Sequence, residues 1–172
     1  MNADSMGVAH TRRDHGMDIL KAAQQQNWPA VKQLATATLE LNAQQFHIHL
    51  TFQLAIQSRA WDIVEMLVSK GIDPNVKSLN RRPAILVAAS AQAWSTVQVL
   101  AKEGADLSVT DDDDHTALLL AASYRKWDIV DFLASAGADI TVKGTYLVYS
   151  KITVLSINQS INQNSINLFE PN

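Results

Sequence analysis

The four tryptophans of the chain are separated by a fixed step of 33 residues, and this period limits the fold more than any other feature. They stand at positions 28, 61, 94 and 127. Three further columns keep the same step: Leu34, Leu67, Leu100 and Leu133; Thr38, Gly71, Gly104 and Gly137; and Glu40, Asp73, Asp106 and Asp139. A fixed period of this size is typical of a protein built from stacked repeats.

Each period contains two segments with apolar residues at helical spacing, which predicts a pair of helices per repeat. Thr116 is suited to cap the first helix of its repeat, and Gly71, which follows Lys70, is suited to end a second helix. Small alanine pairs recur in the first helices and would let neighbouring helices approach closely. A single repeat buries too little apolar surface to offset its chain entropy, so we expect the repeats to stack.

Three segments carry a resemblance to the ankyrin repeat family: residues 104–107 (Gly-Ala-Asp-Leu), residues 137–140 (Gly-Ala-Asp-Ile) and residues 116–122 (Thr-Ala-Leu-Leu-Leu-Ala-Ala). The resemblance implies an all-α, ankyrin-like solenoid of stacked helix-turn-helix repeats with short hairpin loops. The chain departs from the family pattern because no copy has Thr-Pro-Leu-His. The family's Gly-His before the second helix is also replaced, by Gln26-Asn27, Arg59-Ala60, Gln92-Ala93 and Arg125-Lys126.

The register predicts three regions along the chain. Residues 1–16 are polar and aperiodic and are expected to form a disordered tail. Residues 17–143 form the predicted ankyrin-like repeat domain, with repeats at about 17–44, 45–77, 78–110 and 111–143. Residues 144–172 are expected to form a degenerate C-terminal capping repeat, and the alternative is a loose strand-forming tail.

Composition excludes several classes of function. The net charge of −3 argues against nucleic acid as a partner, and the absence of cysteine excludes disulfides and thiol catalysis. No apolar run approaches the roughly 18–20 residues that span a bilayer, so no membrane association is expected. Catalytic motifs such as a glycine-rich phosphate loop or His-Glu-x-x-His are absent. We therefore expect a cytoplasmic protein that is not an enzyme and binds no cofactor or metal.

The resemblance also implies where a partner would bind. In ankyrin-like folds the hairpin loops, or fingers, and the inner helices form a concave binding surface. The register places ten residues of this chain there: Phe46, His47, His49, Leu79, Asn80, Arg82, Asp112, Asp113, His115 and Tyr124. Phe46, Leu79 and Tyr124 stand out because large apolar side chains at exposed positions often anchor interfaces. The alternative is that each of these three tucks under its own finger.

The turn of each finger is a second departure from the family, which usually has glycine there. The column reads Ile48, Arg81 and Asp114. Asp tolerates a positive φ better than Ile or Arg does, so the finger at residues 45–49 is expected to adopt a different turn. An extended finger would place His47 and His49 on one side, but no further metal ligand is predicted near them.

Adjacent fingers are predicted to carry opposite charge. Residues 111–114 are four consecutive aspartates, and Arg81 and Arg82 stand one period earlier. One interpretation is a solvated, partly paired surface of little energetic consequence. Another is a dock for a basic segment of a partner. The run lacks the alternation and the final glutamate of a calcium loop.

The predicted function is non-catalytic protein–protein interaction through the concave face, with an unidentified protein partner. The alternative is a self-assembling scaffold that oligomerises through the C-terminal segment. The irregular repeats and the Asn/Ile-rich tail also suggest an effector of intracellular bacteria, which would act on host proteins in the host cytoplasm. For the tryptophan column, the main interpretation is a structural ladder, and the other is an aromatic patch on the convex side.

Overall fold

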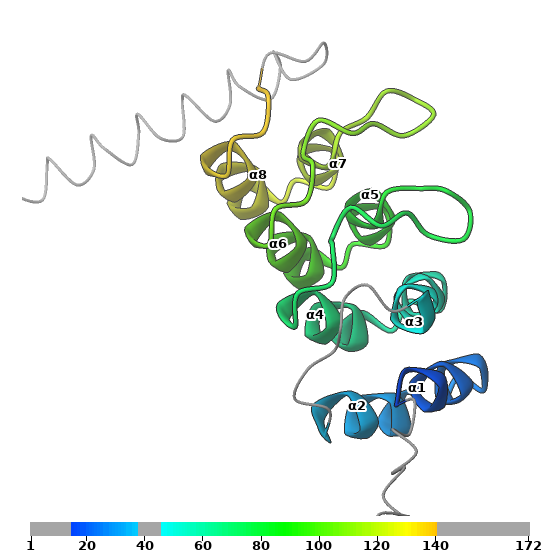
Figure 1. The fold of residues 1–172 in the computed structure, drawn as a ribbon. Helices are drawn as coiled ribbons and strands as arrows, with labels where there is room; N and C mark the ends of the chain where they lie inside the picture. Colours follow the sequence, from blue (N-terminus) through cyan, green and yellow to red (C-terminus); the bar gives the residue numbers. More distant parts are fainter. Residues whose placement is uncertain (1–14, 38–45, 141–172) are drawn as a thin grey trace, which may run out of the picture. The chain divides into compact units, whose positions relative to one another are not determined.

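A computed structural model describes residues 15–37 and 46–140 of the chain. These residues form eight α-helices and no strand, with one isolated β-bridge between Lys77 and Pro83 (Figure 1). The all-α class and the pairing of helices predicted from the period are confirmed. The chain divides into two compact units, Met1–Ile72 and Asp73–Asn172, and each is described separately.

The first unit contains the first two helix pairs. Its helices are α1 (His15–Gln24), α2 (Trp28–Ala37), α3 (Phe46–Gln57) and α4 (Trp61–Ser69). Within each pair α1 packs on α2 and α3 on α4, and between the pairs α1 lies beside α3 and α2 beside α4. Ile19, Val31, Phe52 and Ile63, one from each helix, are completely buried. This apolar layer gives the unit its core.

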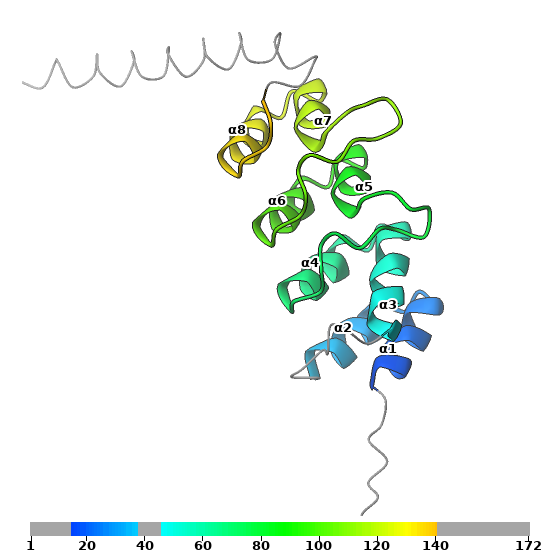
Figure 2. The same cartoon turned by 45° about the horizontal axis from the view of Figure 1, so that its top comes forward.

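The second unit repeats the arrangement. Its helices are α5 (Ala84–Ser90), α6 (Trp94–Lys102), α7 (Ala117–Ser123) and α8 (Trp127–Ser135). The inner helices α5 and α7 lie side by side, as do the outer helices α6 and α8, and the two ribbon views agree on this (Figures 1 and 2). The Asn75 side chain joins the two repeats, because its Oδ1 accepts the Asp106 N–H at 2.8 Å and its Nδ2 donates to the Gly104 carbonyl at 3.2 Å.

The same backbone geometry closes the turn between the two helices of all four pairs, although none of these turns has a glycine. Gln26, Arg59, Gln92 and Arg125 all have φ between 54° and 59°. The next residue donates its N–H to a carbonyl five residues earlier, as Ala93 does to Ala88 at 2.9 Å. This is the Schellman pattern of a helix end, and a left-handed residue is required to form it. The second helix then begins at a tryptophan in every pair, as predicted, and all four tryptophans are half-buried.

The predicted glycine column ends the outer helices in the same way. Gly104 has a φ of 90°, and the next residue, Ala105, donates its N–H to the Leu100 carbonyl at 2.9 Å. A Cβ added at Gly104 would meet no atom within 4 Å, so the position requires glycine for its backbone conformation and not for space.

Two boundaries differ from the sequence prediction. Helix α1 begins at His15, two residues before the expected start of the first repeat. The prediction of a finger at residues 45–49 is wrong for residues 46–49, because these residues form the first turn of α3. The remaining predictions on residues 1–14 and on the C-terminal segment 144–172 lie outside the described residues.

Candidate protein-binding surface

Two fingers, both in the second unit, have the same backbone. The first finger comprises residues 78–82 and the second comprises residues 111–115. In the first, Ser78 donates its N–H to the Arg82 carbonyl at 2.9 Å, and Arg81 donates its N–H to the Ser78 carbonyl at 2.8 Å. Arg81 turns the chain with a φ of 61°. The Ser78 hydroxyl accepts the Arg82 N–H at 3.2 Å, and this bond ties the two ends of the finger together.

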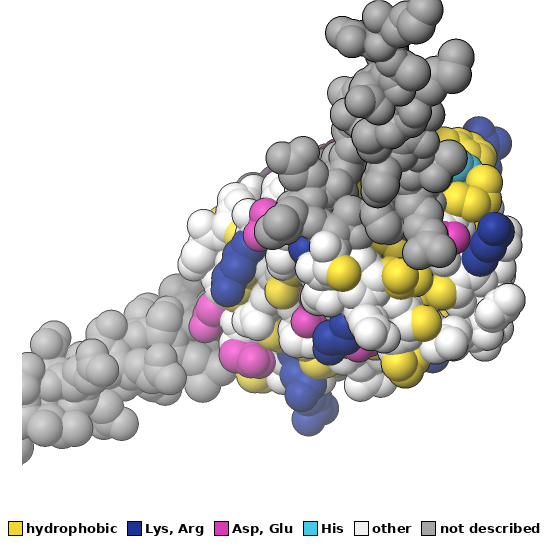
Figure 3. All heavy atoms as spheres, turned by 60° about the horizontal axis from the view of Figure 1, so that its bottom comes forward, with side chains coloured by type: hydrophobic (Ala, Val, Ile, Leu, Met, Phe, Trp, Pro, Cys, Tyr) yellow, Lys and Arg dark blue, Asp and Glu magenta, His cyan; other side chains and the backbone are white. Residues whose placement is uncertain are grey.

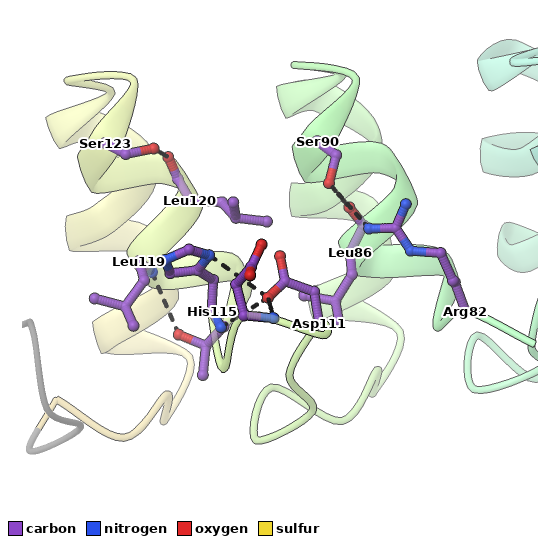
Figure 4. Close-up of polar contacts among 10 residues, drawn as sticks. Arg82, Leu86, Ser90, Asp111, His115, Leu119, Leu120 and Ser123 are labelled. Atoms are coloured by element: carbon purple, nitrogen blue, oxygen red, sulfur yellow. Dashed lines mark hydrogen bonds and ion pairs between the residues drawn. The ribbon is translucent and has the colours of Figure 1, made fainter.

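The second finger places an aspartate where the first has a serine. Asp111 donates its N–H to the His115 carbonyl at 3.0 Å, and Asp114 takes the turn with a φ of 61°. One carboxylate oxygen of Asp111 accepts the N–H groups of Asp113 at 3.0 Å and of His115 at 2.8 Å. The same oxygen lies 3.5 Å from Nδ1 of the His115 imidazole, as Figure 4 shows. The carboxylate therefore holds this finger more tightly than the Ser78 hydroxyl holds the first.

The ionisation of Asp111 reflects this environment. Partial burial alone would raise the pKa of the Asp111 carboxyl, but the hydrogen bonds from His115 and Asp113 and the nearby imidazole outweigh it and lower the pKa. The group is thus a carboxylate at neutral pH and is engaged within its own finger. Thr116, which follows the finger, caps α7 by accepting the Leu119 N–H at 3.3 Å, as predicted.

Large apolar side chains remain exposed next to the fingers. Leu79 in the first finger and Tyr124 at the end of α7 each have 42% of their surface exposed. The Tyr124 ring also contacts the Trp94 indole edge to face, with 5.8 Å between the ring centroids. Trp94 therefore packs against the following repeat, in agreement with the structural interpretation of that tryptophan. The alternative that Leu79 and Tyr124 tuck away completely is not what the structure shows.

A cleft of about 480 Å³ separates the two fingers. Its lining consists of Lys77, Asn80, Arg81, Arg82, Pro83, Leu86, Val109, Thr110, Asp111 and Asp112. The first finger supplies a basic wall and the second an acidic wall, with Pro83, Leu86 and Val109 between them. Figures 1 and 2 show the two loops projecting on the same side of α5 and α7.

The two arginines of the first finger form no ion pair with the second finger among the described residues. Arg82 points along α5 and donates a long hydrogen bond of 3.5 Å to Ser90 Oγ (Figure 4). The exposed Asp112 takes part in no ion pair with Arg81 or Arg82 in the described part of the chain. The pairing expected in the interpretation of a solvated, partly paired surface is therefore not found at these three residues, and both signs line the cleft.

The predicted residues of the first unit lie on a helix. Phe46 begins α3 with 73% of its surface exposed, and its ring meets the neighbouring His47 ring at 6.0 Å. His47 and His49 are two positions apart on α3, and residues at that spacing do not face each other on a helix. The prediction that the His47 and His49 imidazoles lie on one side of an extended finger is therefore wrong. Thr51 donates its hydroxyl hydrogen to the His47 carbonyl at 2.8 Å within the same helix.

One acidic cluster has metal-ligand atoms close together. Asp111, Asp113 and His115 each place one such atom within 4.8 Å of the others. The N–H bonds and the imidazole contact of Asp111 already account for the arrangement, because they are what closes the finger. We assign no metal to this cluster.

The sequence-based set of site residues omitted Arg81 and Lys77, which line the cleft. A signal for both was present, since Arg81 stands in the same column as Asp114 and Lys77 directly precedes the finger. On the face shown in Figure 3, basic, acidic and apolar side chains are interspersed and no broad region of a single charge is seen. None of the described helices is both long enough and apolar enough to cross a bilayer.

Comparison with known proteins agrees with the geometry. A family model described as ankyrin repeats, in three copies, matches residues 52–144, which is more than half of the chain. A search of the curated proteins found no match. The match covers α4 to α8 and α3 from residue 52 onward, together with the left-handed turns at Arg59, Gln92 and Arg125 and both fingers. The chain belongs to the ankyrin repeat family, whose repeats generally serve as protein–protein interaction modules and are typically non-catalytic.

Proposed function

We propose that this chain is a non-catalytic module that binds a partner protein through the fingers and inner helices of its second unit. The observation that supports the proposal is the exposure of Leu79 in the first finger and of Tyr124 at the end of α7, each 42%. Neighbouring apolar side chains such as Leu86 and Leu118 are almost completely buried. Exposed apolar groups beside polar ones are the usual anchors of an interface.

The fingers are suited to this role because their backbones are held before any partner arrives. Each finger closes with two backbone–backbone hydrogen bonds and at least one backbone N–H donated to the side chain at its first position. A preorganised loop loses little conformational entropy on binding, so more of the contact energy remains as affinity.

The test compares capture of proteins from a cell lysate by the natural chain and by a variant with Leu79→Glu and Tyr124→Ala, followed by titration of the purified partner. We expect the variant to lose the partner, because one substitution places a charge and the other removes a ring at the interface. The control is Asp131→Lys, an exposed position on α8 that should leave binding unchanged. Equal affinity in both variants would contradict the proposed face.

Because Tyr124 also packs on Trp94, the helix content of each variant is checked by circular dichroism. Leu79→Glu alone separates the two contributions, since it leaves the ring contact between Tyr124 and Trp94 in place. Phe46, the exposed first residue of α3, is a separate anchor candidate in the first unit, and Phe46→Ala tests it independently.

The finer expectations stay predictions. They are an effector role in the host cytoplasm and self-assembly through residues 144–172, which lie outside the described residues. Sedimentation of the full chain and of a chain ending at Lys143 tests the second, because only the full chain should gain mass with concentration if that segment drives assembly.

A further inference from the structure

The cleft between the fingers presents opposite charges to a ligand. Its two walls carry opposite charge, and Arg81 and Arg82 form no ion pair with the second finger among the described residues. The acidic side chain available to a ligand is Asp112, because the Asp111 carboxylate is already engaged by two N–H groups and an imidazole. On the basic wall, Arg81 and Arg82 are exposed. A ligand that fills the cleft would therefore meet cations on one side and an anion on the other.

We propose that this cleft binds an extended segment of the partner protein in which acidic and basic side chains alternate. The inference rests on the proposed function and adds the chemical character of the partner. A cleft of about 480 Å³ has the size of a small-ligand site, so it accepts a few residues of a partner and not a folded domain.

The alternation follows from the geometry of an extended chain. Successive side chains of a strand point to opposite sides, so adjacent residues would face opposite walls. An acidic residue then points toward Arg81 and Arg82, and its basic neighbour points toward Asp112. The next two residues can repeat the pattern, which makes the whole segment complementary to both walls.

The floor of the cleft supports long charged side chains. Pro83 and Val109, which are half-buried, lie between the walls and also line the adjoining groove, whereas the third apolar residue of the lining, Leu86, is completely buried. The methylene stems of Glu, Lys and Arg can cover such a surface while their charged ends reach the walls. Short polar side chains would leave the floor in contact with water.

Partners of a single charge fit less well. A purely acidic segment would place carboxylates against Asp112, and a purely basic one would place cations against Arg81 and Arg82. Like charges brought together at an interface reject a partner, so the two walls select for alternation and not for net charge. Each pair is exposed to solvent, so the walls contribute selectivity more than affinity.

The experiment uses two fluorescein-labelled octapeptides of identical composition. One alternates Glu and Arg, and the other has all its Glu residues before all its Arg residues. Fluorescence anisotropy is measured with the full chain at low and at physiological salt. We expect the alternating peptide to bind at least about tenfold more tightly than the block peptide, and the difference to shrink with salt because the walls are exposed.

Variants of the two walls give the sharper result. Arg81→Glu with Arg82→Glu makes both walls acidic and should weaken the alternating peptide by about tenfold. Asp112→Arg with Asp113→Arg makes both basic and should do the same. All four substitutions together reverse the walls and should restore binding, because the same peptide shifted by one residue again matches them. Asp111 is left unchanged in every variant, since it closes the finger.

Three outcomes would overturn the proposal: no binding of the alternating peptide, equal binding of both peptides, or no recovery in the four-substitution variant with unchanged helix content. Failure here is distinguishable from failure of the proposed function. A partner captured through Leu79 and Tyr124 that ignores all wall variants would leave the binding module intact and remove only the cleft from its interface.

Discussion

Residues 46–49 and residues 112–115 occupy corresponding positions in the repeat, yet the first begin a helix and the second belong to a finger. At the turn position of this column the chain has Ile48 in one segment and Asp114 in the other. Asp114 adopts a φ of 61°, whereas Ile48 lies inside α3 and is completely buried. The repeat register therefore aligns the two segments, but it does not determine whether the backbone forms a helix or a finger.

The physical reason lies in two side chains of each segment. A β-branched residue such as Ile strongly disfavours a left-handed backbone, so a finger turn at Ile48 would be strained. Both fingers also have a short oxygen-bearing side chain at their first position, Ser78 or Asp111, where the sequence of the first segment has the longer Gln45. The helix removes both problems and lets Ile48 join the core of the first unit.

The largest expected effect comes from Ile48→Gly. If the segment is helical and its side chain buried, the substitution removes core packing and adds a glycine to a helix, for a loss of about 3 kcal/mol or more in unfolding free energy. Urea unfolding measures it. The control is Phe46→Gly at the exposed start of the same helix, which should cost about 1 kcal/mol or less. A stabilising Ile48→Gly would show that the segment forms a finger after all.

A smaller effect is expected from Asp111→Ala in the second finger. The substitution leaves two backbone N–H groups without their acceptor and removes the His115 contact, so we expect a loss of about 2 kcal/mol. Thermal and urea unfolding provide the measurement. The matched control is Asp112→Ala, whose exposed carboxylate closes no finger and whose loss should change stability by less than about 0.5 kcal/mol.

Acid should reduce the penalty of Asp111→Ala. Because the folded-state pKa of Asp111 is lowered, its ionised form contributes stability above the unfolded-state pKa of about 3.9. That contribution is lost as the pH falls through the folded-state pKa. The gap between the natural chain and the variant should therefore be constant near neutral pH and shrink in acid. A gap that stays constant down to the lowest pH at which the chain folds would mean that packing, and not the charge, holds the finger.

Much of this fold follows from the sequence alone. The tryptophan column predicts the start of every second helix, and Gly71 and Thr116 are predictable as helix-end residues because their roles depend on nearest neighbours. Those features need only local chemistry and a period. The family match then adds the interaction role at the level of the family.

The candidate site was less predictable. Leu79 and Tyr124 could be placed by register, but their exposure depends on how neighbouring side chains such as Trp94 pack. The two charged walls could be seen in the sequence, whereas the absence of an ion pair between them depends on where Arg82 points, which is along α5 toward Ser90. Side-chain direction in an exposed loop is not encoded in the period.

The smallest expected effect separates the two fingers from each other. Arg81 and Asp114 have the same φ of 61°, but Asp tolerates the left-handed region better than Arg, so Arg81 carries more strain. Arg81→Gly should stabilise the chain by about 1 kcal/mol and Asp114→Gly by about half of that. Differential scanning calorimetry of both variants measures the ranking. The control is Gln98→Gly inside α6, which should instead destabilise by about 1 kcal/mol. If Asp114→Gly stabilised more than Arg81→Gly, the cost of the turn would not follow the intrinsic preference of its residue. The tighter closure of the second finger by Asp111 would then have to impose strain that the looser first finger avoids.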